Sequence, residues 1–261
     1  MKGLSRSFLA VMIVFLYFPI LYLAFYSFNS DGSMTNFESF TLSYYKNVIK
    51  STSLITVLMN TIAVALISSS IATFVGMVGA LYLYFLRQKY VKDLLLVLNN
   101  VLIVSPDVII GASLLILFSI LGVTLGSTSV ILAHIAFSVP IVVLMILPNL
   151  YQQNDNLVAA AEDLGASAFD VITKVIIPNL KSGIFAGFLM AFTYSLDDFA
   201  VTFFVTGNGF STLSVEIYAM ARRGITLEIN AISTIIFVVV LGIAFIYYLL
   251  SDRKIKRGKT T

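Results

Sequence analysis

The sequence predicts an all-α polytopic membrane protein that crosses the bilayer about six times. Of its 261 residues, 59% are hydrophobic and 11% are charged, and the mean hydropathy is +0.99. A soluble domain carries about 25% charged residues. A soluble fold of this size could not bury so much apolar surface, so lipid is the solvent that fits the composition.

Six apolar stretches separate along the chain, and each is long enough to cross roughly 30 Å of hydrocarbon as a helix. They lie near residues 8–28, 54–86, 94–121, 128–150, 183–206 and 229–250. None alternates between apolar and polar residues, as the strands of a membrane β-barrel do. We expect the first stretch to be a retained helix and not a secretory signal, because no small-residue cleavage site follows it. Residues 1–261 are expected to form a single transmembrane domain.

The positions of the basic residues predict that both chain ends face the cytoplasm. In that orientation, twelve of the sixteen Lys and Arg residues lie in cytoplasmic segments; the other four are Lys46, Lys50, Arg222 and Arg223. Basic residues are concentrated on the cytoplasmic side of membrane proteins. The basic residues after Asp252 are expected to anchor the chain at anionic headgroups and not to bind nucleic acid.

Segment 151–181 is the longest expected cytoplasmic connection, and its pattern predicts two short helices joined by a bend. Asn154 to Asn156 are good N-caps, Gly165 suits the left-handed residue that ends a helix, and Ser167 can cap a second helix. Pro178 is expected to stop or kink the chain where it enters the membrane. A stiff bend with a surface of alanines could seat a partner protein or could be an ordinary connection, and the pattern leaves both open.

The same segment resembles the EAA loop of ABC-importer permeases, in which Glu-Ala-Ala is followed at fixed spacing by Gly, Ile and Leu-Pro. The residues on these positions are Ala160, Ala161, Gly165, Val175, Ile177 and Pro178. The Glu of the motif falls on Ala159, and Glu162 is the carboxylate that could replace it. The resemblance implies that Ala160, Ala161, Glu162, Gly165 and Pro178 couple the chain to a separate ATPase.

Four further segments are similar to the spermidine/putrescine permeases of this family. They are Phe28-Asn29-Ser30, Ser105-Pro106-Asp107-Val108, Ala133-His134-Ile135 and Ser195-Leu196-Asp197-Asp198. The resemblance implies the MetI-like permease fold and a polyamine permease of the bacterial inner membrane. It also implies three partners, namely a second permease subunit, an ATP-binding subunit dimer and an external substrate-binding protein. The outer loop 207–228 would touch that binding protein.

We expect the chain to be a transport subunit without enzyme activity and without a cofactor of its own. Its only Gly-Lys-Thr begins at Gly258, and Arg253 stands where a phosphate-binding loop needs its first Gly. ATP and magnesium would therefore be used by the partner ATPase. One alternative is a permease for another small solute. A second is an ion-coupled secondary transporter, although the sequence shows no evident inverted repeat. A third is an intramembrane aspartyl protease, although the Gly-x-Gly-Asp signature of those enzymes is missing.

Three acids, Asp107, Asp197 and Asp198, lie within spans that contain no Lys or Arg. A carboxylate at the centre of a membrane helix costs about 2.5–3.5 kcal/mol, so it needs a cavity, a partner or a proton. Because internal salt bridges are not expected, the partner should be water, a hydroxyl or a cation from outside. A polyamine is such a cation, and Tyr194 would add an aromatic face for it. These four residues are the expected substrate pathway.

A structural interpretation of the same acids stays open. Asp107 follows Pro106, where a helix can break, and could simply cap the next helix, while the Asp197–Asp198 pair could sit at a wet helix end. On a continuous helix, Asp198 would share a face with Tyr194, and Asp197 would point about 100° away. His134, the only histidine, is expected to pack or to form hydrogen bonds, because no ligand lies at the spacing that a metal site needs.

Overall fold

The structure is a computed structural model that describes residues 2–224 and 226–257, with their side chains except at 2–6, 10, 155 and 243–257. The described residues are mainly helical, and the β-pairing among them is an isolated bridge between Asn29 and Phe40. The predicted all-α class is confirmed. The chain divides into two compact units, Val57–Glu216 and the combination of Met1–Thr56 with Ile217–Thr261. A single domain over residues 1–261 stays a prediction.

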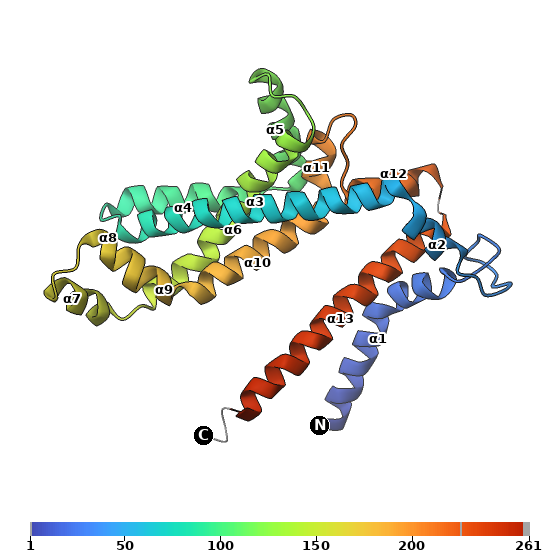
Figure 1. The fold of residues 1–261 in the computed structure, drawn as a ribbon, viewed down its shortest axis with the longest axis horizontal. Coiled ribbons are helices and arrows are strands. Elements are labelled where there is room, and N and C mark those ends of the chain that lie inside the picture. Colours follow the sequence, from blue (N-terminus) through green and yellow to red (C-terminus); the bar gives the residue numbers. More distant parts are fainter. Residues whose placement is uncertain (1, 225, 258–261) are drawn as a thin grey trace. The chain divides into compact units, whose positions relative to one another are not determined.

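The unit Val57–Glu216 is built around α6 (Ser127–Tyr151). Both α10 (Lys181–Asp197) and α4 (Lys89–Val104) pack against α6. The long helix α3 (Thr52–Phe85) belongs to the same group of helices (Figure 1). The 34 residues of α3 make a helix of about 50 Å at 1.5 Å per residue, longer than the hydrocarbon core is thick. Its buried side consists largely of small residues, among them Ala65, Ser68, Ala72, Gly76 and Ala80.

Glycines let α3 and α10 approach α6 closely. A Cβ atom on Gly76 would lie 2.6 Å from Cγ1 of Val142, and a Cβ atom on Gly187 would lie 3.2 Å from the same atom. Val142 therefore occupies the space that the two missing side chains leave. Small residues at helix contacts are the usual means of close packing in membranes, where apolar burial alone does not drive helices together.

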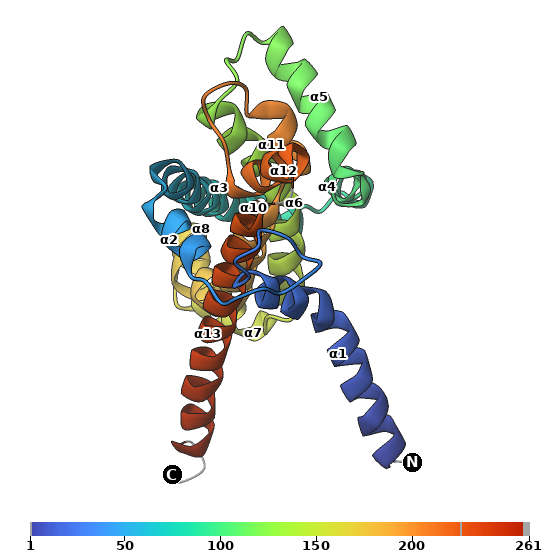
Figure 2. The same cartoon turned by 90° about the vertical axis from the view of Figure 1, so that its right-hand side faces the viewer.

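Two pairs of helices in this unit meet at sharp bends. α4 and α5 (Asp107–Ile120) form an angle of 106° around Ser105 and Pro106, and Figure 2 shows α5 leaving α4 in a new direction. The expected break at Pro106 is confirmed, because proline lacks a backbone donor and disfavours a helical residue before it. The helical segment Ala168–Asn179 meets α10 at 67°.

The described helices include several of the length and apolar composition that a membrane span requires. In the part of the chain that the structure describes, three continuous helices, Ser7–Tyr26, Thr52–Phe85 and Ser127–Tyr151, are long and apolar enough to cross a membrane, and the count rises to five if each bent pair is one span. The last expected span, 229–250, falls in α13 (Leu227–Arg257), whose apolar part with described side chains is Leu227–Gly242. Six crossings therefore stay a prediction.

In the other unit, α13 packs against α1 (Lys2–Tyr26) and α2 (Ser43–Lys50). Tyr17 of α1 and Phe237 of α13 have ring centroids 6.0 Å apart. Asn29 organises the loop after α1, because its buried side chain donates to the carbonyls of Ser33 and Asn36 and accepts from the N–H of Glu38. Most apolar side chains of α1 are exposed in the isolated chain, which fits a helix covered by lipid or another subunit.

Candidate functional site

The candidate site lies where α10 gives way to α11 (Ala200–Val205). α10 ends at Asp197, and Asp198 has extended backbone angles, φ −61° and ψ 121°. The carboxylate of Asp198 accepts from the backbone N–H of Val201 at 3.2 Å and of Thr202 at 2.8 Å. Capping of the next turn by an aspartate competes with continuation of the helix. The prediction of a continuous helix over 183–206 is therefore wrong, and with it the shared face inferred for Tyr194 and Asp198.

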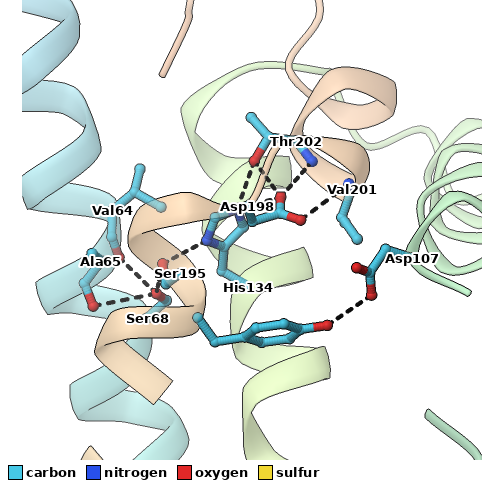
Figure 3. Close-up of polar contacts among 10 residues, drawn as sticks. Val64, Ala65, Ser68, Asp107, His134, Ser195, Asp198, Val201 and Thr202 are labelled. Carbon is cyan, nitrogen blue, oxygen red and sulfur yellow. Dashed lines mark hydrogen bonds and ion pairs between the residues drawn. The ribbon is translucent and has the colours of Figure 1, made fainter. Parts of the chain in front are cut away.

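Asp198 also belongs to a buried polar cluster that joins four helices (Figure 3). The Thr202 hydroxyl donates to Asp198 Oδ2 at 2.7 Å, and His134 Nε2 of α6 lies 2.8 Å from the same hydroxyl and 3.5 Å from Oδ2. On the other side of the ring, Nδ1 lies 2.6 Å from the Ser195 hydroxyl of α10, which is 3.2 Å from Ser68 of α3. All five residues are buried.

This cluster corrects one expectation and confirms another. A hydroxyl partner for the acids was expected and is present, but the expectation that only water, a hydroxyl or an outside cation faces the acids is corrected, because His134 Nε2 also lies 3.5 Å from Asp198 Oδ2. The expectation that His134 forms hydrogen bonds is confirmed. The sequence hid the contact, since His134 and Asp198 are far apart along the chain and only the packing of α6 against α10 and α11 brings them together.

Asp107 has a different partner. The Tyr194 hydroxyl of α10 donates to Asp107 Oδ1 at 2.7 Å, so the contact joins the first residue of α5 to the last turn of α10. The Tyr194 ring meets Phe137 of α6 edge-on, with centroids 4.9 Å apart. Two of the four expected pathway residues therefore touch. Both are half-buried, which leaves part of each side chain accessible.

Asp197 stands apart from this bonding. It is exposed at the end of α10, and no other described residue donates a hydrogen bond to it. The neighbouring helix α11 lies close to α5 at Gly111, which has no side chain. A Cβ atom built there would lie 3.0 Å from Cα of Val201 and 3.2 Å from the carbonyl oxygen of Ala200. The three acids thus lie at two helix breaks whose flanking helices, α5 and α11, pack together.

The segment 151–181 has the helix–Gly–helix form that the sequence predicts. Asn154 caps α7 (Asp155–Asp163) by accepting from the N–H of Asn156 at 3.0 Å. Gly165 has φ +82°, and the N–H of Ala166 reaches back to the carbonyl of Ala161, which closes the end of the helix. Ser167 then caps α8 (Ala168–Asp170).

The continuation of this segment contains an element that the pattern does not indicate. A π-helical turn, η1 (Val171–Ile176), follows α8 and leads into α9 (Ile177–Asn179), which contains Pro178. The bend toward α10 falls at Leu180, two residues after Pro178, in accord with the expected kink; that the chain enters the membrane there stays a prediction. Lys174 donates a side-chain hydrogen bond to Asp170, and this bond, with that of Ser167, holds the pKa of the Asp170 carboxyl below its usual value.

The two faces of α7 differ in their surroundings. Ala161 is half-buried and packs on the core that α6 forms with η1, so it faces inward. Ala160 and Glu162 are exposed. The most exposed apolar side chains of the bend are Leu164, at 89%, and Phe169, at 75%, which sequence reasoning did not select. The sequence carries no signal that separates them from the buried apolar residues of the same segment, such as Val171 and Ile176.

Comparison with known proteins identifies the class. Residues 72–257 match the family described as binding-protein-dependent transport system inner membrane component, and the chain belongs to that family. The spermidine/putrescine transport system permease protein PotC of Escherichia coli (strain K12) is 34% identical over 97% of this chain and 96% of its own. PotC of Haemophilus influenzae is 32% identical over 96% and 97%. The putrescine transport system permease protein PotI of E. coli K12 is 30% identical over 93% and 89%.

Solved structures support the same fold. A bacterial ABC transporter involved in the import of the acidic polysaccharide alginate contains a chain that matches with a TM-score of 0.73 and 17% identity, over 97% of this chain and 98% of its own. The MetNI methionine ABC transporter, in inward-facing conformations, matches with a TM-score of 0.62 and 17% identity, over 78% and 96%. The expected MetI-like permease fold is therefore confirmed.

Proposed function

We propose that this chain is a transmembrane permease subunit of a bacterial ABC importer and moves the polyamines spermidine and putrescine inward. The family, and relatives named as polyamine permeases that match nearly the full length of the chain, support this proposal. One observation supports the choice of a cationic substrate. Asp107, at the break before α5, accepts a hydrogen bond from Tyr194, near the break after α10, and the carboxylate of Asp197 at that second break is exposed.

The chemistry of this region suits an alkyl chain that bears ammonium groups. Carboxylates are expensive inside a membrane unless something compensates them, and a passing ammonium group does so. The faces of Tyr194 and Phe137 offer cation–π contact, and aromatic carbon also contacts the methylene groups between charges. Broken helices near the midplane are a common binding-site device in transporters. Asp107, Asp197, Asp198 and Tyr194 together form the proposed substrate pathway.

We propose that the bend at 151–181 contacts a separate ATPase, which uses ATP and magnesium, and transmits its conformational change to the membrane helices. Ala160, Glu162 and Gly165 lie on its exposed side, Ala161 packs inward, and Pro178 stands at the bend toward α10. Exposed Leu164 and Phe169 give this surface the large apolar groups that a docking contact needs. Because α7 packs on η1 and η1 leads through α9 to α10, a push on the bend reaches the helix that carries Tyr194 and Asp197.

The proposed assembly has four kinds of component. Beside this chain it contains a second permease subunit (PotB-like), an ATP-binding subunit dimer (PotA-like) and an external substrate-binding protein (PotD-like). The chain lies in the bacterial inner membrane as a multi-pass protein, and we propose that both termini are cytoplasmic, in accord with the distribution of Lys and Arg.

The test is transport by the assembled complex in proteoliposomes with ATP on the cytoplasmic side. We expect uptake of labelled spermidine to need both ATP and the binding protein. Asp107→Asn and Asp197→Asn should lower uptake at limiting substrate by at least tenfold, since each removes a full negative charge from the pathway. Asp93→Asn, an exposed acid on α4, is the matched control and should leave uptake unchanged. Failure to take up either polyamine, or equal uptake by all variants, would overturn the proposal.

A further inference from the structure

The three acids of the proposed pathway differ in how far the protein itself satisfies them. Both oxygens of Asp198 already accept hydrogen bonds, from the N–H of Val201 and from the N–H and hydroxyl of Thr202. Its side chain is only 4% exposed. Asp197 is exposed, and among the described residues only Tyr194 donates to Asp107, through a single oxygen. Asp198 therefore has little capacity left for a ligand, whereas Asp107 and Asp197 do.

His134 is placed to hold the break between α10 and α11 in one geometry. Its Nδ1 side contacts Ser195, which precedes the break, and its Nε2 side contacts Thr202, which follows it. An ionised carboxylate can only accept hydrogen bonds, so the Thr202 hydroxyl donates its one hydrogen to Asp198. The same hydroxyl must therefore accept from His134 Nε2. The ring thus donates to the segment after the break and is fixed against the segment before it.

The other ring nitrogen can be satisfied in two ways. When Ser68 donates to the carbonyl of Val64, 2.7 Å away, Ser195 can donate to Ser68 and accept from a protonated Nδ1. His134 is then a cation 3.5 Å from the carboxylate of Asp198. When Ser68 donates to Ser195 instead, Ser195 donates to an unprotonated Nδ1. Both arrangements leave every member of the cluster hydrogen-bonded, and a buried network is stable only under that condition.

We propose that His134 is a positioning residue that fixes the α10–α11 break and commits Asp198 to the fold, so that Asp107 and Asp197 are the carboxylates presented to the substrate. This inference rests on the proposed transport of polyamines and narrows its pathway from three acids to two. His134 contacts Ser195 and Thr202 on either side of Asp197, so the imidazole sets where the Asp197 carboxylate points without touching the substrate.

Accessibility separates the two adjacent acids directly. The chain contains no cysteine, so a thiol introduced by Asp197→Cys or Asp198→Cys is the only one that it carries. The assembled complex is treated with a membrane-impermeant cationic thiosulfonate. We expect Asp197→Cys to react at least tenfold faster than Asp198→Cys and spermidine to slow its reaction. Equal rates, or protection of Asp198→Cys alone, would overturn the inference.

A double-mutant cycle tests the positioning role. His134→Gln keeps an amide donor near the place of Nε2, so the complex should still assemble with an unchanged melting temperature. We expect it to raise KM for spermidine-stimulated ATPase about tenfold with little change in kcat, and to raise KM much less in an Asp197→Asn background. Independent effects would multiply in the double variant and would refute the positioning role.

A control and a second variant keep the test decisive. Ser138→Ala lies one turn from His134 on α6 and removes a buried hydroxyl that bonds to none of the described residues, so it should change neither KM nor stability. If Asp198→Cys fails to assemble, Thr202→Val and Thr202→Ser replace it, and only the serine should preserve KM. Should spermidine not stimulate the wild-type complex, the proposed function falls, while the labelling rates without substrate still decide which acid is accessible.

Discussion

The bend at 151–181 and the helix break at Asp198 lie at the two ends of α10 and are held by different kinds of contact (Figure 1). At the bend, the capping hydrogen bonds are local: Asn154 bonds a residue two positions away, and Ser167 bonds one three positions away. At the break, His134 bonds residues 61 and 68 positions away, and Tyr194 bonds Asp107 across 87 positions. The caps of the bend depend on neighbours in sequence, whereas the break adds to the local cap by Asp198 several bonds between residues that are neighbours only in space.

This difference has a functional side. A bend built from local caps keeps its shape while its surface, with Leu164 and Phe169 exposed, is pressed by a partner. A break held by distant side chains depends on how α6, α10 and α11 are placed, and it changes when those helices move. The proposed importer needs both properties. The bend must stay rigid while it shifts the helices, and the moving helices must alter the substrate site. Substitutions that affect one region and spare the other test this division.

The largest effect is expected where α3 approaches α6. Gly76→Ala would put a Cβ atom 2.6 Å from Val142, and overpacking of this kind costs about 1–3 kcal/mol. The added methyl group should lower the melting temperature of the detergent-solubilised complex and disturb the site, whose Ser68 lies on the same helix. Gly79→Ala, three residues further on, meets only ordinary contact at 3.7 Å from Val143 and should be neutral or stabilising. Equal melting temperatures of the two variants would contradict the packing argument.

How much the sequence predicts follows the same division. The caps at Asn154 and Ser167, the left-handed Gly165 and the break at Pro106 were predictable, because each follows from a residue's own backbone preference or a neighbour's side chain. The His134 contact with Asp198 was not, since the sequence does not give the distance between α6 and α10. The inward orientation of Ala161 was missed for the same reason, because an alanine on a short helix carries no mark of which face is buried.

A smaller effect on stability, with a clear effect on coupling, is expected at Gly165. Its φ of +82° is costly for residues with a side chain, by about 1–2 kcal/mol, and most of all for a β-branched one. Gly165→Val should distort the bend and reduce substrate-stimulated ATPase activity several-fold while spermidine still binds. Gly165→Asn is the matched control, because asparagine tolerates this conformation, and a built Cβ atom meets no neighbour within 4 Å. Normal stimulation in the valine variant would show that the bend does not transmit the push.

The smallest effect is expected at Asp170, on the second arm of the bend. The hydrogen bond from Lys174, then that from Ser167, holds the pKa of this carboxyl below its usual value, so the folded state favours the ionised form. The resulting stabilisation is present above the unfolded pKa, about 3.9, and is lost as pH falls through the lower folded value. Asp170→Asn should therefore lower the melting temperature slightly at pH 6, and the difference from wild type should shrink toward pH 3. Lys174→Gln should reproduce part of this loss. Added to Asp170→Asn, it should not lower the melting temperature further, because the lysine no longer faces a carboxylate and the remaining bond to Ser167 does not depend on it. A difference that grows as pH falls would mean that the pair does not act on the folded bend in this way.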